Sequence, residues 1–388
     1  MGYAMNFEFA TANRIIFGSG TAGKVASLAA SLGSRAFVIT DCYIERSVDL
    51  LDQIRNEGVE VENFCVADEP TTDLVLIGVQ KAREAASDVV IGIGGGSVID
   101  TGKAIASLLA NGGEPLDYLE VIGKGKPILK PSAPYIAMPT TAGTGAEVTR
   151  NAVLASKEHG VKVSLRSPFM LPDIAIVDPD LTHSMPPEVT ASTGLDALTQ
   201  VMEPYVSNQA NPLTDAFCRQ GLALAGRSLQ RVYQDGSDTS AREEMALTSL
   251  LGGLALANAK LGAVHGFAGV IGGMYPVPHG VICARLLPLV METNVRALES
   301  RAPGSEYLDR YQDVAQILTD DVSASIAEGV EWVQNLCNHL NVPGLAVFGV
   351  KKVDFPEIVS KSQKASSMKG NPIPLFDDEL TAILEQAY

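Results

Sequence analysis

Three side chains of this sequence have the chemistry to hold a divalent metal ion: Asp196, His265 and His279. The chain has only five histidines, and two of these fall in one apolar stretch rich in glycine and alanine. Imidazole and carboxylate are typical ligands of divalent transition metals. One carboxylate and two imidazoles leave coordination positions open for water or substrate, as a catalytic metal requires. These three residues are therefore candidate metal ligands and candidate catalytic residues.

Gln200 follows Asp196 by four residues, so both side chains face the same side if the segment is helical. An amide oxygen can coordinate a divalent ion, although more weakly than imidazole. A hydrogen bond from the amide to a metal-bound water is an equally good interpretation. We include Gln200 among the candidate metal ligands with both alternatives open. No role is assigned to His159, His183 or His339.

Two polar loops indicate a nucleotide. Gly95, Gly96 and Ser97 follow a predicted strand and precede a predicted helix. Glycine lets the backbone approach a ligand closely, and a helix N-terminus favours a pyrophosphate. The glycines do not match GxGxxG, and a turn that only packs strand against helix is the alternative. A second loop, residues 138–149, also follows a predicted strand and contains several threonines, which either contact a nucleotide or make structural hydrogen bonds. Two such loops at strand ends of one sheet favour the nucleotide.

Asp41 directly follows the predicted strand 36–40. An acidic residue at the end of an early strand can accept a hydrogen bond from a ribose 2′-hydroxyl and would repel a 2′-phosphate. Asp41 therefore favours NAD over NADP. An ordinary turn aspartate is the alternative.

The elements that must position these residues change in type near residue 183. Strands are expected at 36–40, 61–66, 88–93, 134–139 and 174–178, with helices at 48–57, 74–86 and 101–110 between them. Alternating strands and helices predict a mainly parallel sheet. From Pro186 on, only helices are expected: 187–205, 211–232, 241–274 and 281–295. We predict an α/β dinucleotide-binding domain over residues 1–183 and an all-helical metal-binding domain over residues 184–388.

Composition limits the class of protein. The 388 residues suffice for two or three domains, and 46% hydrophobic with 19% charged residues is typical of a globular enzyme. A formal net charge of −16, with no visible basic stripe, argues against nucleic acid and anionic membrane as partners. The five cysteines are scattered without a CxxC pair, which favours reduced thiols and a cytoplasmic location. No membrane-spanning segment is expected.

Several segments together resemble one enzyme family. They are residues 14–18 (RIIFG), 94–103 (GGGSVIDTGK), 139–149 (PTTAGTGAEVT), 193–199 (TGLDALT), His265 and 278–280 (PHG). With them the chain resembles the iron-containing (group III) alcohol dehydrogenases almost end to end. The resemblance implies NAD(P)-dependent interconversion of a small alcohol and an aldehyde or ketone, with Fe²⁺ or Zn²⁺ as the metal. We also expect a homo-oligomer, a dimer or larger.

The resemblance also assigns residues. Asp196, His265 and His279 take the family's metal-ligand positions, and Lys162 matches a lysine near the ribose. The nucleotide-contact positions, with Asp100 from the same glycine loop, are Gly95, Gly96, Ser97, Asp100, Thr140, Thr141 and Thr144. Two positions depart from the family, which usually has histidine at Gln200 and often at Gly269. The first departure bears on the metal, and the second removes an imidazole expected near the nicotinamide.

Three alternatives to this function stay open. One is a reductase that works without bound metal, as maleylacetate reductases of the superfamily are thought to do. Another is a lyase like dehydroquinate synthase, which would need several basic residues near the metal. The third is a nucleotide-binding protein without catalysis. Residues 366–372 form a further loop that looks specific to a subfamily and is expected to edge the substrate pocket.

Overall fold

The computed structural model describes residues 6–388 except 44, 46, 120 and 157. Contacts between residues divide the chain into two compact units. Residues 10–141 and 145–183 form one, which we term the sheet unit. Residues 6–9, 142–144 and 184–388 form the other, the helical unit. The threonine-rich loop is therefore divided between the units: residues 142–144 belong to the helical unit, and the residues on either side belong to the sheet unit.

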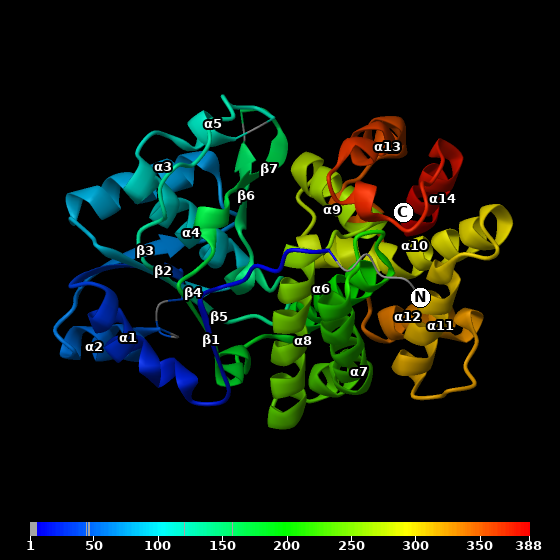
Figure 1. Cartoon of the computed structure of the whole chain (residues 1–388), viewed down its shortest axis with the longest axis horizontal. Helices are drawn as coiled ribbons and strands as arrows, with labels where there is room; N and C mark the ends of the chain where they lie inside the picture. Colours follow the sequence, from blue (N-terminus) through cyan, green and yellow to red (C-terminus); the bar gives the residue numbers. More distant parts are fainter. Residues whose placement is uncertain (1–5, 44, 46, 120, 157) are drawn as a thin grey trace. The chain divides into compact units, whose positions relative to one another are not determined.

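The described residues of the sheet unit form a six-stranded sheet in the order β1-β8-β5-β4-β2-β3, in which neighbouring strands pair in parallel (Figure 1). The strands are β1 (Arg14–Phe17), β2 (Arg35–Asp41), β3 (Glu60–Val66), β4 (Val89–Gly94), β5 (Tyr135–Pro139) and β8 (Ile174–Val177). The predicted parallel sheet and its five strands are confirmed. The short β1 was not predicted from the sequence.

Alternating side chains along β2 enter two different cores. Phe37 and Ile39 pack in one cluster with residues of α3 (Thr72–Glu84) and α4 (Gly96–Asn111). Ala36 and Val38 pack in another with residues of α1 (Val25–Leu32) and α2 (Val48–Asn56). Successive strand residues point to opposite faces, so the sheet has helices on both faces. A strand buried on both faces has no polar alternation, which explains the apolar runs in the sequence.

Two features of the sheet unit differ from expectation. Helix α4 begins at Gly96, five residues earlier than the predicted 101, because the glycine-rich segment itself forms its first turn. An antiparallel pair, β6 (Asn151–Ser156) with β7 (Val161–Arg166), was also missed. A one-turn helix α5 (Pro115–Tyr118) completes the unit.

Residues 184–388, all of which the structure describes, form nine α-helices. They are α6 (Pro187–Val206), α7 (Pro212–Gln234), α8 (Thr239–Asn258), α9 (Ala263–Met274), α10 (His279–Arg301), α11 (Glu306–Thr319), α12 (Ile326–His339), α13 (Phe355–Lys364) and α14 (Asp377–Ala387). Residues 184–388 are all described and contain no strand. The expected all-helical second half is confirmed.

The expected single helix over 241–274 is wrong. The chain leaves the helix after Asn258 and re-enters it at Ala263, and the two helices are bent by 95°. Gly262 caps the second helix, and a Cβ there would lie 2.8 Å from Glu203 Oε1 and 2.9 Å from Asn371 Oδ1. The break therefore depends on partners far away in sequence, which local composition does not reveal.

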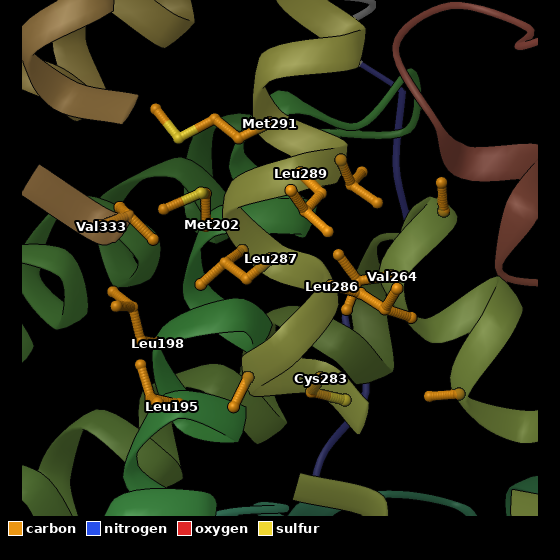
Figure 2. Packing of buried hydrophobic residues seen from close by; sticks show 14 of the residues in the cluster. Leu195, Leu198, Met202, Val264, Cys283, Leu286, Leu287, Leu289, Met291 and Val333 are labelled. Carbon is orange, nitrogen blue, oxygen red and sulfur yellow. The ribbon is translucent and has the colours of Figure 1, made fainter. Parts of the chain in front are cut away.

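The core of the helical unit forms where α6, α9, α10 and α12 meet. Figure 2 shows side chains from these helices gathered around α10, among them Leu198, Val264, Leu287 and Val333. Cys283 belongs to the same cluster and is fully buried. This packing holds the helices that carry the candidate metal ligands.

The expectation of reduced thiols is wrong for one pair. Cys42 and Cys65 form a disulfide, with Cα atoms 5.1 Å apart. Strand β2 pairs in parallel with β3, and Thr40 lies opposite Cys65. Cys42, two residues after Thr40, therefore lies close to Cys65. Cys218, Cys283 and Cys337 are free and buried.

No single described helix is long and apolar enough to cross a membrane, and α8 and α9 meet that criterion only when taken together as a bent pair.

Candidate active site

Helix α6 presents three polar residues on one face. Asp196, Gln200 and Glu203 are spaced by four and three residues, so they lie above one another along the helix. All three are buried. Buried polar side chains such as these need partners from neighbouring elements.

Helix α9 is fixed at its start by one of these residues. Glu203 Oε1 accepts a hydrogen bond from the Val264 backbone N–H at 2.7 Å, and Asn371 Oδ1 accepts from that of Ala263 at 3.1 Å. Carboxylate and amide oxygens satisfy N–H groups that a helix N-terminus leaves unpaired. The other oxygen of Glu203 lies 2.7 Å from His265 Nδ1. The contact therefore places His265 and sets its orientation.

Helix α10 begins with His279 and presents Cys283 one turn later. Its first turn lies against the backbone of α6, since a Cβ on Gly280 would lie 2.4 Å from the Ser192 carbonyl oxygen. Glycine is required at 280 for this approach, which brings the first residue of α10 to the turn of α6 that carries Asp196.

The three predicted ligands converge. His265 Nε2 lies 3.4 Å from Asp196 Oδ1, and His279 Nε2 lies 3.9 Å from the same oxygen. Cys283 joins them, its Sγ lying 3.8 Å from His265 Nε2 and 3.7 Å from His279 Nε2. One potential ligand atom from each of the four residues lies within 4.8 Å of the others.

The electrostatics of this cluster call for a cation at its centre. Asp196 Oδ1 is buried and has no hydrogen-bond donor. If His265 Nδ1–H donates to Glu203, then His265 Nε2 carries a lone pair that faces a carboxylate oxygen. Two acceptors 3.4 Å apart are compatible only with a proton or a metal ion between them. The donor set of carboxylate, imidazoles and sulfur suits a divalent transition metal.

The same electrostatic interactions shift the pKa values of the side chains in this cluster. Burial alone would raise the pKa of Asp196, but His265 and His279 outweigh it and hold that pKa below its ordinary value. Burial alone would lower the pKa of His265, yet Cys283, Asp196 and Glu203 together raise it well above its ordinary value. Burial raises the pKa of the Cys283 thiol to about 12. The pKa shifts of Asp196 and His265 thus both favour a negative carboxylate beside a positive charge.

Gln200 lies on the same helix face, but its amide nitrogen has another partner. Nε2 donates to the Gly143 carbonyl oxygen at 3.0 Å. Gly143 itself packs against α6, because a Cβ there would lie 2.9 Å from Thr193 Cβ. Gln200 therefore ties residues 142–144 to α6. Gly269, the second departure from the family, is exposed on α9, and a Cβ there would meet no described atom within 4 Å.

Most of the nucleotide candidates lie at one edge of the six-stranded sheet, whereas Lys162 lies on β7 of the two-stranded sheet. Strands β2, β4 and β5 are parallel neighbours, so Asp41, the glycine segment and the threonine segment follow their carboxyl ends. The Thr140 N–H donates to Gly94 O at 3.0 Å, and a Cβ on Gly95 would lie 3.4 Å from Thr141 Cγ2. Gly95 caps α4, whose first turn, Gly96 and Ser97 included, presents N–H groups at this edge. Open α/β sheets bind ligands at such an edge.

Three candidates of the nucleotide set, Asp100, Lys162 and Asp41, already have protein partners. Asp100 Oδ1 lies 2.9 Å from Lys103 Nζ, and its Oδ2 accepts from the Val153 N–H at 2.9 Å. Lys162 Nζ is 2.6 Å from Glu69 Oε1.

Asp41 Oδ1 accepts from the Tyr43 N–H at 3.0 Å. Thr144 belongs to the segment that packs with the helical unit.

Sequence reasoning missed Glu203 and Cys283. Glu203 follows Asp196 by seven residues and Cys283 follows His279 by four, so the helical spacing that singled out Gln200 also applies to both. Nothing local marks them as different from a surface glutamate and a core cysteine.

Comparisons with known proteins agree along the whole chain. Residues 12–179 match the model "Iron-containing alcohol dehydrogenase", and residues 190–388 match the model "Fe-containing alcohol dehydrogenase family, C-terminal". The chain is 33% identical to 1,3-propanediol dehydrogenase of Klebsiella pneumoniae, covering 100% of both chains. A solved 1,3-propanediol oxidoreductase superposes with a TM-score of 0.91 at 34% identity, covering 99% of this chain and 100% of that one. The structure of sulfoacetaldehyde reductase from Bifidobacterium kashiwanohense in complex with NAD⁺ superposes with a TM-score of 0.87 at 27% identity, covering 98% of each chain.

These findings favour an alcohol dehydrogenase over a lyase or a metal-free reductase. The buried carboxylate on α6, the imidazoles on α9 and α10 and the glycine segment at the sheet edge agree with that family. The chain belongs to the iron-containing alcohol dehydrogenases and is an oxidoreductase that acts on alcohols and aldehydes with a nicotinamide cofactor.

Proposed function

We propose that this enzyme interconverts a small alcohol and its aldehyde with NAD, assisted by a divalent metal held by Asp196, His265 and His279. The observation that carries the proposal is the convergence of these side chains around a buried carboxylate oxygen without a donor. A buried acceptor surrounded by imidazole nitrogens is costly unless a cation lies among them.

The role of each side chain follows from its surroundings. Asp196 supplies the negative charge that balances the ion, and its burial strengthens that attraction. Glu203 accepts from His265 Nδ1 and so keeps Nε2 free of hydrogen, oriented for coordination. His279 is the most exposed of the ligands, with 39% of its side chain accessible, so we assign the substrate approach to its side of the cluster.

When bound, the metal supplies Lewis acidity toward the substrate oxygen and the nicotinamide accepts or delivers the hydride.

We assign the nucleotide to the carboxyl edge of β2, β4 and β5. The N–H groups of Gly95, Gly96 and Ser97 suit a pyrophosphate, and glycine at 95 leaves room beside Thr141.

The hydroxyls of Thr140, Thr141 and Thr144 and the ammonium of Lys162 suit ribose and phosphate oxygens. Lys162 would exchange its partner Glu69, which is half exposed, for the cofactor. Asp100 is better suited to holding Lys103 and the β6 strand than to touching the cofactor, because both its oxygens have partners.

Asp41 is assigned the choice of cofactor. It stands at the carboxyl end of β2, next to β4, where an acidic side chain favours a free 2′-hydroxyl. We therefore propose NAD rather than NADP.

Relatives indicate the class of substrate. Among similar proteins are dehydrogenases of 1,3-propanediol and of choline and a sulfoacetaldehyde reductase. All of these names describe a primary alcohol or its aldehyde, so we propose a primary alcohol here. The metal is Zn²⁺ or Fe²⁺, and the fourth coordination position has two candidates in this chain, Gln200 and Cys283.

A cytoplasmic location and a homo-oligomer, dimer or larger, stay predictions of the sequence. Sedimentation velocity checks the second.

The test is a screen of primary alcohols and aldehydes with NADH and NADPH on wild type and His279→Ala. His339→Ala is the matched control, since His339 lies on α12 of the same unit and contacts Gln230 and Gln234 instead. We expect His279→Ala to lose metal and activity while NADH binding stays near that of wild type. Full metal content and full turnover in His279→Ala would remove His279 from the site.

A further inference from the structure

We propose that Cys283 is the fourth protein ligand of this metal, so that the donor set is one carboxylate, two imidazoles and one thiolate. This inference rests on the proposed function and concerns a residue that was not among the metal ligands expected from the sequence. It assigns to Cys283 the place that the sequence offered to Gln200.

The distances between donor atoms fit one common centre. Zinc–ligand bonds of about 2.0–2.3 Å in a tetrahedron put oxygen and nitrogen about 3.4 Å apart, and sulfur and nitrogen about 3.6 Å apart. The two imidazole Nε2 atoms lie 3.4 and 3.9 Å from Asp196 Oδ1. The same two atoms lie 3.8 and 3.7 Å from Cys283 Sγ. Four edges of the polyhedron therefore agree with a coordination shell to within about 0.5 Å.

Both imidazoles face oxygen and sulfur with the same nitrogen. Nε2 of His265 and Nε2 of His279 each contact Asp196 and Cys283, so each ring points between the two. A ring held this way aims its lone pair at the space enclosed by all four residues. A sulfur that only filled the core would not need two ring nitrogens directed toward it.

The position of Cys283 is determined by the helix that carries His279. The two residues are four apart at the start of α10, and this part of the helix lies close to α6 because position 280 is glycine. Cys283 is fully buried, and Figure 2 shows its side chain projecting from α10. A buried, preformed sulfur position requires little reorganisation when an ion binds.

Cys337 provides a comparison within the same unit. It is also free and buried, but its Sγ contacts the backbone carbonyl oxygen of Ala284 at 3.4 Å. Its contact is the one expected of a core cysteine, whereas Cys283 contacts two potential metal ligands.

Gln200 is the weaker candidate because its amide already has a structural task. Nε2 donates to Gly143 O, a partner that accounts for this buried amide without a metal contact. A thiolate is also a stronger and softer donor than an amide oxygen, and it shifts preference toward Zn²⁺. Zinc sites can expand to five ligands during catalysis, so four protein ligands still leave a position for the substrate oxygen.

Cobalt substitution tests the assignment without relying on turnover. Metal-free protein is loaded with one equivalent of Co²⁺, bound metal is measured after dialysis, and the near-ultraviolet spectrum is recorded for thiolate-to-cobalt charge transfer. The variants are Cys283→Ser and Cys283→Ala, with Cys337→Ser as the matched buried cysteine and Gln200→Ala as the rival ligand. Circular dichroism checks that each variant is folded.

The charge-transfer band should appear in wild type, Cys337→Ser and Gln200→Ala, and disappear in both Cys283 variants. Affinity for Zn²⁺ should fall in the Cys283 variants by at least the tenfold to 100-fold typical of weaker changes around a metal. Stoichiometric Co²⁺ without the band in wild type, or a band that persists in Cys283→Ser, would overturn the assignment and leave the proposed function intact. Failure of wild type to bind Co²⁺ at all would overturn both.

Discussion

Replacing Glu203 by glutamine is expected to weaken metal binding although Glu203 is not a ligand. Its carboxylate accepts two hydrogen bonds, from His265 Nδ1 and from the Val264 N–H, both at 2.7 Å. Glutamine has nearly the same shape but only one acceptor oxygen. Its NH₂ group must then face either the imidazole N–H or the backbone N–H, and both of these are donors. If the NH₂ group faces the backbone, the Val264 N–H in the first turn of α9 loses its acceptor. If it faces the imidazole, His265 changes its orientation.

The size of the effect follows from the bond that is lost. A hydrogen bond to a charged group contributes about 1.5–3 kcal/mol, and about 1.4 kcal/mol is a factor of ten in affinity. Loss of one such bond corresponds to roughly a tenfold to 100-fold rise in the metal dissociation constant, the range usual for such carboxylate–histidine contacts. Nucleotide affinity should stay unchanged.

The assay is competition for Zn²⁺ or Co²⁺ with a chromophoric chelator, at fixed pH, for wild type, Glu203→Gln and the control Asp215→Asn. Asp215 is a buried carboxylate of the same unit, but its partner is Arg310 at 2.9 Å. Its replacement should lower the stability of the unit without changing metal affinity. Equal dissociation constants for wild type and Glu203→Gln would show that Glu203 does not support metal binding through His265, as would an equal loss in both variants.

Three further predictions concern the sheet unit. Asp41→Gly should raise the use of NADP relative to NAD by about tenfold, or about 1.4 kcal/mol; steady-state kinetics with both cofactors check it, and a wild type that prefers NADPH would contradict it. Burial raises the pKa of Glu147 from the ordinary 4.5 to about 7 in the folded chain. The folded state therefore binds more protons between these values, and stability should fall as pH rises through that window. Relative to Glu147→Gln, wild type should lose about 3 kcal/mol of unfolding free energy between about pH 4.5 and pH 8, and parallel pH profiles would show that Glu147 is not responsible. Reduction of the Cys42–Cys65 disulfide, which closes a loop across 23 positions, should destabilise the unit by about 3 kcal/mol; denaturant unfolding with and without reductant measures it, and Cys42→Ser should not respond.

Much of the fold follows from sequence because its signals are local. The buried strands are short apolar runs between turn residues, and β2, β4 and β5 were predicted to within one or two residues. The start of α6 at Pro187 is marked by proline and by Glu188 in its first turn. The break between α8 and α9 depends instead on Glu203 and Asn371, which reach Gly262 from distant segments. No window around the break contains that information.

The site residues likewise fall into those that local sequence identifies and those that only the packing identifies. Asp196, His265 and His279 were predicted because their residue types are rare and suited to a metal, and the structure brings them together. Cys283 and Glu203 were missed because a cysteine in an apolar helix and a glutamate near a helix end are common. Their significance arises only from which atoms they face, and that is set by the packing of α9 and α10 on α6.

The most direct test of metal-assisted catalysis is a metal titration of the reductase activity. Protein freed of metal by chelation is mixed with NADH and a primary aldehyde, and NADH oxidation is followed as Zn²⁺ or Fe²⁺ is added in steps. We expect almost no turnover without metal and a linear rise that ends at one ion per chain. Full turnover by the metal-free protein, unchanged by added metal and by Asp196→Ala, would contradict it.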